Sequence, residues 1–396
     1  MSRLTPRRIL RYASTCLRLK SYLNAPGDGR VRPRIGARQL VWSLLIGSIL
    51  RETSFHAIEA LVCSRARRAL AVAQSFGDDA LSYFTARLRP EPTRHALATA
   101  LRQAKRNKAF DNSRFIGIAV DGSSACRCSA QGCALCRPFK NKEGQVAGYR
   151  HHVVMASIVG TGLSLPIDVE PYGPGDSEYA AGQRLLARAV HLLGCRFAQY
   201  VVADGEYATA PFLHHVGDLR LRVVARLKAN LPELWRAAQT RFAAMSPTST
   251  FQHRRDRVEV WDAEDFDPWD ALRWTSVRVL RYLQHKPDGS VVEAYWLTDF
   301  PSSQVSSQSL FHIAKSRWEI ENQGFNDAKN RHGFEHMAHH DANSLLVRWL
   351  LLALALTIER LFRLRHLRRG NHKPRAPIEL LRLLRLSLGA DFSNSS

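Results

Sequence analysis

Apolar residues recur at helical spacing through about the first 110 residues. Residues 39–51 and 57–72 carry them three and four positions apart, which predicts two helices. Residues 24–38 contain Gly, Pro and four arginines, a composition typical of a loop or arm. We therefore expect residues 1–110 to form a helical N-terminal region.

The pattern changes near residue 113, where short apolar runs rich in branched residues begin. Such runs predict strands at 114–120, 149–159, 163–169, 200–203 and 221–228. Helical periodicity predicts helices over 179–193 and 208–215. The order is strand, strand, strand, helix, strand, helix, strand. We expect an α/β fold, with residues 111–228 forming the first part of its core.

A second block of strands interrupts this core at residues 229–305. Strand-like runs at 257–261, 274–283 and 291–299 predict a β-rich insertion. A long helix is predicted over 306–330.

An apolar helix is predicted over 344–365. Its most apolar part, 345–361, contains Arg348, Glu359 and Arg360, and its uncharged run is shorter than the ~20 residues that span a bilayer. It is therefore predicted to be a buried core helix. Residues 306–370 would complete the core, and residues 371–396 would be a basic, flexible tail.

The charge of the chain points to a polyanionic partner. Lys and Arg total 57 against 35 Asp and Glu, which gives a formal net charge of +22. Nucleic acid is the expected partner, and a solubilising or ribosome-like basic surface is the alternative. The opening segment can place a basic face along a helix through Arg3, Arg7, Arg8, Arg11, Arg18 and Lys20. We interpret residues 1–110 as a DNA-binding region, with a helical packing or dimerisation module as the alternative.

The basic run at 363–375 has two interpretations as well. It is either a phosphate-contacting arm or a solvated segment.

Two aspartates stand at the ends of predicted buried strands. Asp121 follows the run 114–120 and Asp204 follows 200–203, and each is followed by Gly. A single Asp-Gly at a strand end is common turn chemistry. Two of them, in the right strand–helix order, favour a pair of carboxylates at one edge of a sheet, and carboxylate oxygens are the ligands that Mg²⁺ prefers.

The predicted helix 306–330 supplies a third carboxylate. Arg317 and Glu321 are four residues apart and share a face, and Lys329 lies near the same face. Such a face suits a metal and phosphate groups, although a solvated Arg–Glu pair is the alternative. Glu319 is the local competitor of Glu321. Other alternative carboxylates near the site are Asp168, Glu170 and Asp176.

Three sequence blocks carry a resemblance to a known family. They are Ile118-Ala-Val-Asp-Gly122, Val201-Val-Ala-Asp-Gly205 and Arg317-Trp-Glu-Ile-Glu-Asn-Gln-Gly-Phe-Asn326. The chain resembles the DDE transposases of bacterial insertion sequences. The resemblance implies a ribonuclease-H-like mixed sheet with flanking helices and a β-rich insertion.

The resemblance also implies the roles of individual residues. Asp121, Asp204 and Glu321 would be catalytic and would hold two Mg²⁺ or Mn²⁺ ions, while Arg317 and Lys329 would bind DNA phosphates. The sequence departs from the family signature in two places. Ala314 stands where the family often has Tyr, and Lys329 lies one position later than the usual Lys.

The implied activity is cleavage of transposon ends followed by strand transfer into target DNA. The resemblance further implies double-stranded DNA as partner, namely terminal inverted repeats and target DNA, together with a homodimer in the DNA complex and a cytoplasmic, nucleoid-associated location in a bacterium. Two alternatives are a ribonuclease-H-like nuclease without strand transfer and a DNA-binding protein that has lost its catalytic activity.

Four of the seven cysteines form a tight cluster just after Asp121. They stand in a CxC and a CxxC: Cys126, Cys128, Cys133 and Cys136. Four thiolates at this spacing can form a structural zinc site, and four reduced thiols are the alternative. His151 and His152 follow on a predicted strand and must face opposite sides of it. One of them can lie near the metal or the scissile phosphate, unless both are ordinary strand histidines.

Overall fold

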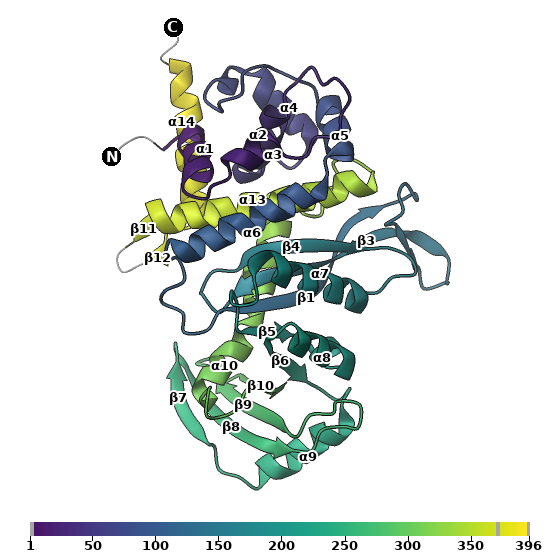
Figure 1. Cartoon of the computed structure of the whole chain (residues 1–396), viewed down its shortest axis with the longest axis vertical. Coiled ribbons are helices and arrows are strands. Elements are labelled where there is room, and N and C mark those ends of the chain that lie inside the picture. The colour runs from purple at the N-terminus through teal and green to yellow at the C-terminus, as the bar shows by residue number, and fades with distance from the viewer. Residues whose placement is uncertain (1–3, 370–372, 394–396) are drawn as a thin grey trace.

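Within residues 4–369 and 373–393, which the computed structural model describes, ten strands form one mixed sheet (Figure 1). Its order is β2-β3-β1-β5-β6-β10-β9-β8-β7, and β4 pairs with β3. Helices α1–α6, α13 and α14 lie above the sheet in Figure 1, and the strands β7–β10 form its lower end. The α/β fold predicted from the sequence is confirmed.

The first part of the core follows the predicted order of elements. Strands β1 (Gly117–Cys128), β3 (Val146–Val159) and β4 (Leu165–Tyr172) pair antiparallel. Strands β5 (Tyr200–Ala203) and β6 (Arg222–Leu227) continue the sheet parallel to β1. Helices α7 (Glu178–Leu193) and α8 (Ala210–Asp218) connect them.

Two strand features differ from the sequence prediction. The run predicted to end before Asp121 continues to Cys128, because β3 goes on pairing with β1 beyond the end of β5. The short strand β2 (Arg137–Lys140), which pairs with β3, was not predicted, since its four residues carry no apolar run.

The β-rich insertion extends the core sheet. It contains α9 (Pro232–Ala243), β7 (Ser249–His253), β8 (Asp256–Phe266), β9 (Val277–His285) and β10 (Val291–Thr298). Strand β10 pairs antiparallel with β6, so the insertion joins the core directly. Sequence reasoning missed α9 and β7. The buried face of α9 is narrow, with only Leu234, Ala238 and Phe242 fully covered.

The predicted long helix is divided by a π-helical segment. It consists of α10 (Ser307–Lys315), α11 (Arg317–Glu319), the π-helix η3 (Ile320–Phe325) and α12 (Asn326–His332). Arg360, on α13 (Ala342–His366), donates hydrogen bonds to the carbonyl of Gln323 and to Asp327. π-Helical turns occur frequently at functional sites, and Glu321 lies within this one.

The N-terminal helices pack around α13, which is buried along most of its length as predicted. They are α1 (Pro6–Thr15), α2 (Lys20–Asn24), α3 (Ala37–Leu50), α4 (Phe55–Cys63), α5 (Asp78–Arg87) and α6 (Pro90–Arg106). Figure 1 shows α6 lying along α13, and α3 and α5 also contact it. The helix predicted over 57–72 ends at Cys63, where Ser64 begins a single 3₁₀ turn, η1 (Arg65–Arg67).

The C-terminal tail is not a flexible segment where it is described. Helix α14 (Pro377–Ser393) buries Leu380, Leu384 and Leu388, and this corrects the prediction for 371–396. The basic run contributes the paired strands β11 (Arg368–Arg369) and β12 (Lys373–Pro374). Arg3 and residues 370–372 lie outside the described residues. None of the described helices is long and apolar enough to cross a membrane.

Candidate active site

The sheet register brings Asp121 and Asp204 next to each other. Val120 of β1 pairs in parallel with Ala203, the last residue of β5. Asp121 and Asp204 are the next residues along these two strands. Asp121 lies where β1 loses β5 as a neighbour, and Asp204 directly follows the last residue of β5. The two aspartates predicted from the strand-end pattern therefore converge.

Arg317 connects the helix to this edge. Its Nη2 lies 2.7 Å from Oε1 of Glu321, and its Nη1 lies 3.7 Å from Oδ2 of Asp121. Glu319, the local competitor, lies elsewhere, since its Oε2 accepts a hydrogen bond of 3.1 Å from the amide of Gly160. The geometry therefore joins Glu321, and not Glu319, to the aspartate pair.

The carboxylates differ in the way their charge is compensated. Burial raises the pKa of Asp121 to about 7, against the opposing effect of Arg317, and Glu321, Glu178 and Asp204 raise it further. Burial works to raise the pKa of Asp204, but the hydrogen bond of 2.8 Å from Lys228 Nζ, a backbone hydrogen bond from Gly205 and the positive charge of Arg317 together lower it. The site thus holds one strongly paired carboxylate and one that binds its proton near neutral pH.

Glu178 is a fourth carboxylate at this edge, and the sequence analysis missed it. It is the first residue of α7, where Tyr172 and Tyr207 donate hydrogen bonds of 3.3 and 3.2 Å to its two oxygens. A side chain at Gly122 would overlap it, since a Cβ there would lie 2.0 Å from Glu178 Cδ. The close approach of Glu178 therefore requires glycine at position 122. This glycine is the one feature of the sequence that reflects the contact.

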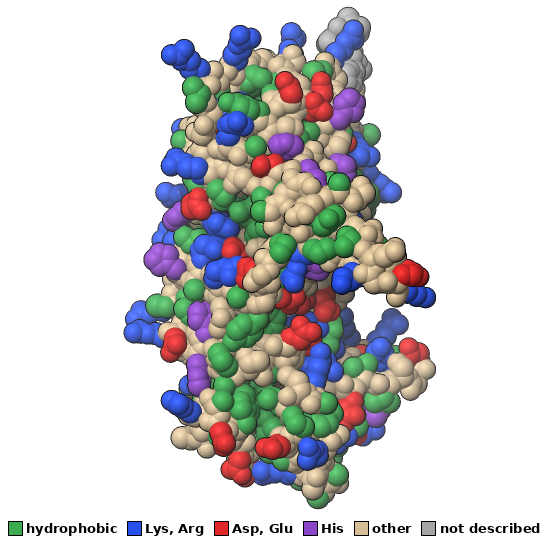
Figure 2. Space-filling view, turned by 90° about the vertical axis from the view of Figure 1, so that its right-hand side faces the viewer, with side chains coloured by type: hydrophobic (Ala, Val, Ile, Leu, Met, Phe, Trp, Pro, Cys, Tyr) green, Lys and Arg blue, Asp and Glu red, His purple; other side chains and the backbone are tan. Residues whose placement is uncertain are grey.

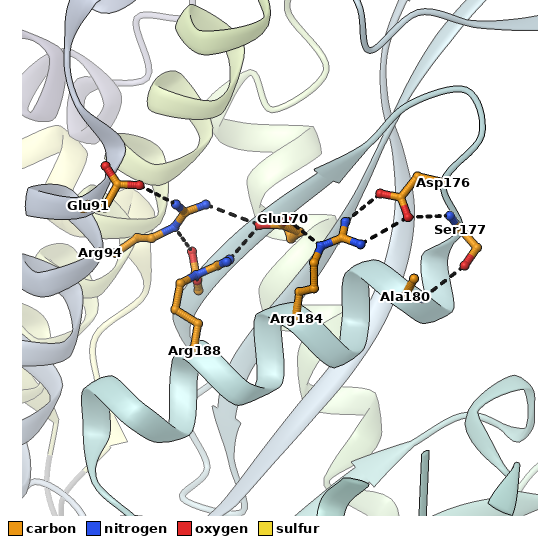
Figure 3. Close-up of polar contacts among 9 residues, drawn as sticks. Glu91, Arg94, Glu170, Asp176, Ser177, Ala180, Arg184 and Arg188 are labelled. Carbon is orange, nitrogen blue, oxygen red and sulfur yellow. Dashed lines mark hydrogen bonds and ion pairs between the residues drawn. The ribbon is translucent and has the colours of Figure 1, made fainter. Parts of the chain in front are cut away.

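The alternative carboxylates form a separate network (Figure 3). Asp168 is fully buried and accepts hydrogen bonds from Arg94 Nε at 3.0 Å and Arg188 Nε at 2.6 Å. Glu170 pairs with Arg94, Arg184 and Arg188, and Asp176 pairs with Arg184 at 2.6 Å. The network links β4, α6 and α7, so its role is to hold the N-terminal helices against the core.

The model of the transposase DDE domain family matches residues 113–358, which is more than half of the chain. The chain belongs to this family. No curated protein matches it significantly. A solved structure of a piggyBac transposase synaptic complex with hairpin DNA is similar at a TM-score of 0.49 and 11% identity, covering 99% of this chain and 81% of that chain.

Lys329 of this transposase does not accompany Arg317. Lys329 lies on α12, and its Nζ forms an ion pair of 3.1 Å with Oε1 of Glu335, which lies just beyond the end of that helix. The position of Lys329, one residue later than the family's usual Lys, rotates it by about 100° around the helix. The phosphate-binding role implied by the resemblance would require this ion pair to open.

The oxygen-rich edge suits hard divalent cations, which DDE transposase domains use in general. The carboxyl side chains of Asp121, Asp204 and Glu321 remain 17%, 28% and 38% exposed, so their oxygens are accessible. They do not all lie within 4.8 Å of one another, unlike ligands gathered on a single ion. Figure 2 shows acidic side chains gathered at mid-height of one face, beside a hollow bordered by Lys and Arg.

The cysteine cluster differs in membership from the set expected from spacing. Cys128 and Cys136 lie together with His151 and His340, whereas Cys126 is buried outside this group. Cys133 lies at its margin, 3.2 Å from His151 Nε2. His152 faces the other side of β3 and packs against Tyr172 at 5.5 Å between ring centroids.

Proposed function

We propose that this transposase cleaves the ends of its own transposon and joins them to target DNA, with Asp121, Asp204 and Glu321 as the catalytic carboxylates. The observation that carries the proposal is the register of β1 and β5, which makes the two aspartates neighbours, together with Arg317, which links Glu321 to Asp121. The strand and helix contexts that suggested these residues separately thus meet at one edge.

Two Mg²⁺ or Mn²⁺ ions fit this set of donors. When bound, such ions activate the attacking oxygen and stabilise the leaving oxygen of a phosphodiester. Asp121, Asp204 and Glu321 would hold these ions, and Asp121 interacts with both of the other carboxylates.

Arg317 and Lys228 have positioning roles in this proposal. Arg317 is almost fully buried and holds Glu321 and Asp121 in place. Lys228, which is half-exposed, holds Asp204. Both side chains are cationic and lie beside the carboxylates, so either can also bind a phosphate oxygen of a DNA strand laid along this edge.

The N-terminal helices supply a candidate surface for the transposon end. Residues of α1 and of the turn after α4 line a surface cavity of about 840 Å³ that contains Arg7, Arg65, Arg67 and Arg68. Guanidinium groups gathered in a concave surface neutralise several phosphates at once. We propose that this surface binds the phosphate backbone of the terminal inverted repeat. Because two ends must be joined at one target, the active complex on DNA would be a homodimer.

The test is a strand-transfer assay on pre-cut transposon ends with a plasmid target. We expect the wild-type protein to yield joined products with Mg²⁺. The Glu321→Gln variant should lose at least ~10²-fold in rate, the scale of a lost charge-stabilising group, and the matched control Glu319→Gln should retain most of its rate. Cleavage of uncut ends without any joining would instead identify a nuclease. Metal-independent DNA binding without cleavage would identify an inactive relative.

A further inference from the structure

Three side chains from residues 128–151 and one from residue 340 meet beside strands β1 and β3. Cys128 ends β1, Cys136 precedes β2, His151 lies on β3, and His340 lies between α12 and α13. Their potential ligand atoms all lie within 4.8 Å of one another. His151 and Cys136 are buried, whereas Cys128 and His340 are partly exposed. No role in DNA cleavage accounts for this gathering.

The separations among these atoms are those of ligands around one ion. The two sulfur atoms are 3.9 Å apart, and Cys136 Sγ lies 3.5 Å from His151 Nε2 and 3.2 Å from His340 Nε2. A tetrahedron with Zn–S bonds of ~2.3 Å and Zn–N bonds of ~2.0–2.1 Å has S–S edges of ~3.8 Å and S–N edges of ~3.5 Å. A disulfide would instead need the sulfurs at ~2.05 Å.

Glycine at position 132 allows His340 to enter the cluster. A Cβ at Gly132 would lie 2.2 Å from Nδ1 and 2.3 Å from Cε1 of the His340 ring. The φ angle of Gly132 is not in the left-handed region, so its turn does not itself require glycine. The space above this residue is therefore taken up by the imidazole.

We propose that Cys128, Cys136, His151 and His340 bind one structural zinc ion. Two thiolates and two imidazoles form a closed tetrahedral set, which is typical of structural and not catalytic zinc. Cys126 has no part in it. Cys133 Sγ lies 3.8 Å from Cys136 Sγ and 3.2 Å from His151 Nε2, but Cys133 does not belong to the set whose ligand atoms all lie within 4.8 Å of one another, so we assign it no bond to the ion. The ion would fasten the segment that follows the Glu321 helix to the hairpin that carries Asp121. This proposal does not depend on the reaction proposed above.

The experiment measures zinc in the full-length protein after purification with zinc and dialysis against metal-free buffer. We expect one zinc per chain in the wild type and in the Cys195→Ser control, because Cys195 is exposed and far from the cluster in sequence. His340→Ala and Cys136→Ser should lose the ion. Cys126→Ser and Cys133→Ser should keep it. Cobalt substitution should give tetrahedral d–d bands and a thiolate charge-transfer band.

A second variant keeps all four ligand residues in the sequence but crowds one of them, His340. Gly132→Ala should weaken zinc binding at least ~10-fold, because a displaced ligand costs well over 1.4 kcal/mol. Gly217→Ala, whose Cβ would meet nothing within 4 Å, is the control. Circular dichroism checks that each variant is folded. The proposal fails if the zinc-loaded wild type retains no ion, if His340→Ala retains it, or if Cys133 and Cys136 are found as a disulfide.

Discussion

Two groups of carboxylates lie on either side of β3, and they differ in charge balance. In the first, Asp168, Glu170 and Asp176 meet three arginines, and Asp168 is held by two of them although it is fully buried. In the second, Asp121, Asp204 and Glu321 interact with two cations, Arg317 and Lys228, and Glu178 adds a fourth carboxylate that affects Asp121. With the exposed Glu91, which also pairs with Arg94, the first group has four carboxylates against three arginines, whereas the second has four against two cations and so the larger excess of negative charge.

The difference separates a structural role from a chemical one. A buried carboxylate with matched guanidinium partners is already satisfied, and removing it leaves those partners uncompensated. A cluster with excess negative charge destabilises itself and gains free energy when divalent cations bind. Two aspartates of one sheet, Asp121 on β1 and Asp168 on β4, are thus distinguished by what surrounds them and not by their residue type.

The largest expected effect is on the reaction, at Asp121. The Asp121→Asn variant should lose at least ~10²-fold in cleavage and strand transfer, because it removes a ligand of the proposed ions. Its stability without divalent ions should be equal to or above that of the wild type, since a buried, mutually repelling charge is gone. Cleavage rates and thermal melting on the same preparations test both parts. A variant that kept its activity would remove Asp121 from the site.

The second prediction is the opposite for Asp168: stability should fall and the rate of the reaction should be kept. The Asp168→Asn variant should lose about 3 kcal/mol or more of unfolding free energy, because Arg94 and Arg188 are left without their buried partner. Denaturant titration measures the loss, and the remaining folded protein should keep its rate of strand transfer. If Asp168→Asn abolished the reaction and left stability unchanged, the two groups would have been assigned the wrong way round.

The third prediction concerns pH. Burial and the neighbouring carboxylates raise the pKa of Asp121 to about 7, above its ordinary value of 3.8. The folded chain therefore holds this proton more tightly than the unfolded chain, and the stability gained from it is lost as the pH rises through about 7. Without added divalent ions, the wild type should fall behind Asp121→Asn in melting temperature between pH 5 and pH 8. If the difference in melting temperature between the wild type and Asp121→Asn stayed constant from pH 5 to pH 8, the raised pKa of Asp121 would be contradicted.

The sequence predicted those parts of the site that depend on local pattern. Asp121 and Asp204 follow apolar strand runs, and Arg317 and Glu321 share a helix face. Glu178 could not be found this way, because its position depends on how the turn after β4 sets the start of α7. His340 could not be found either, since it meets Cys136 across 204 positions of sequence.

For the fold, too, the elements with a local pattern were predicted and the long-range pairings were not. Apolar runs indicated the strands of the core and most of the insertion, because burial on both faces leaves a continuous signal. The pairing of β10 with β6, which makes the insertion part of the core sheet, depends on long-range register. The same is true of α14, because its leucines are buried only through contacts with distant segments such as α3 and α13.

The smallest effect is expected for Lys329→Ala, which changes a residue outside both groups of carboxylates. Its ion pair with Glu335 is partly exposed, so Lys329→Ala should cost at most ~1 kcal/mol of stability. We also expect it to leave the salt dependence of DNA binding unchanged, whereas Lys228→Ala, at the acidic cluster, should reduce the slope by ~1 if Lys228 contacts a phosphate. Binding titrations at several salt concentrations measure both slopes. A reduced slope for Lys329→Ala would mean that the ion pair opens on DNA and that Lys329 contacts a phosphate, as the family resemblance implies.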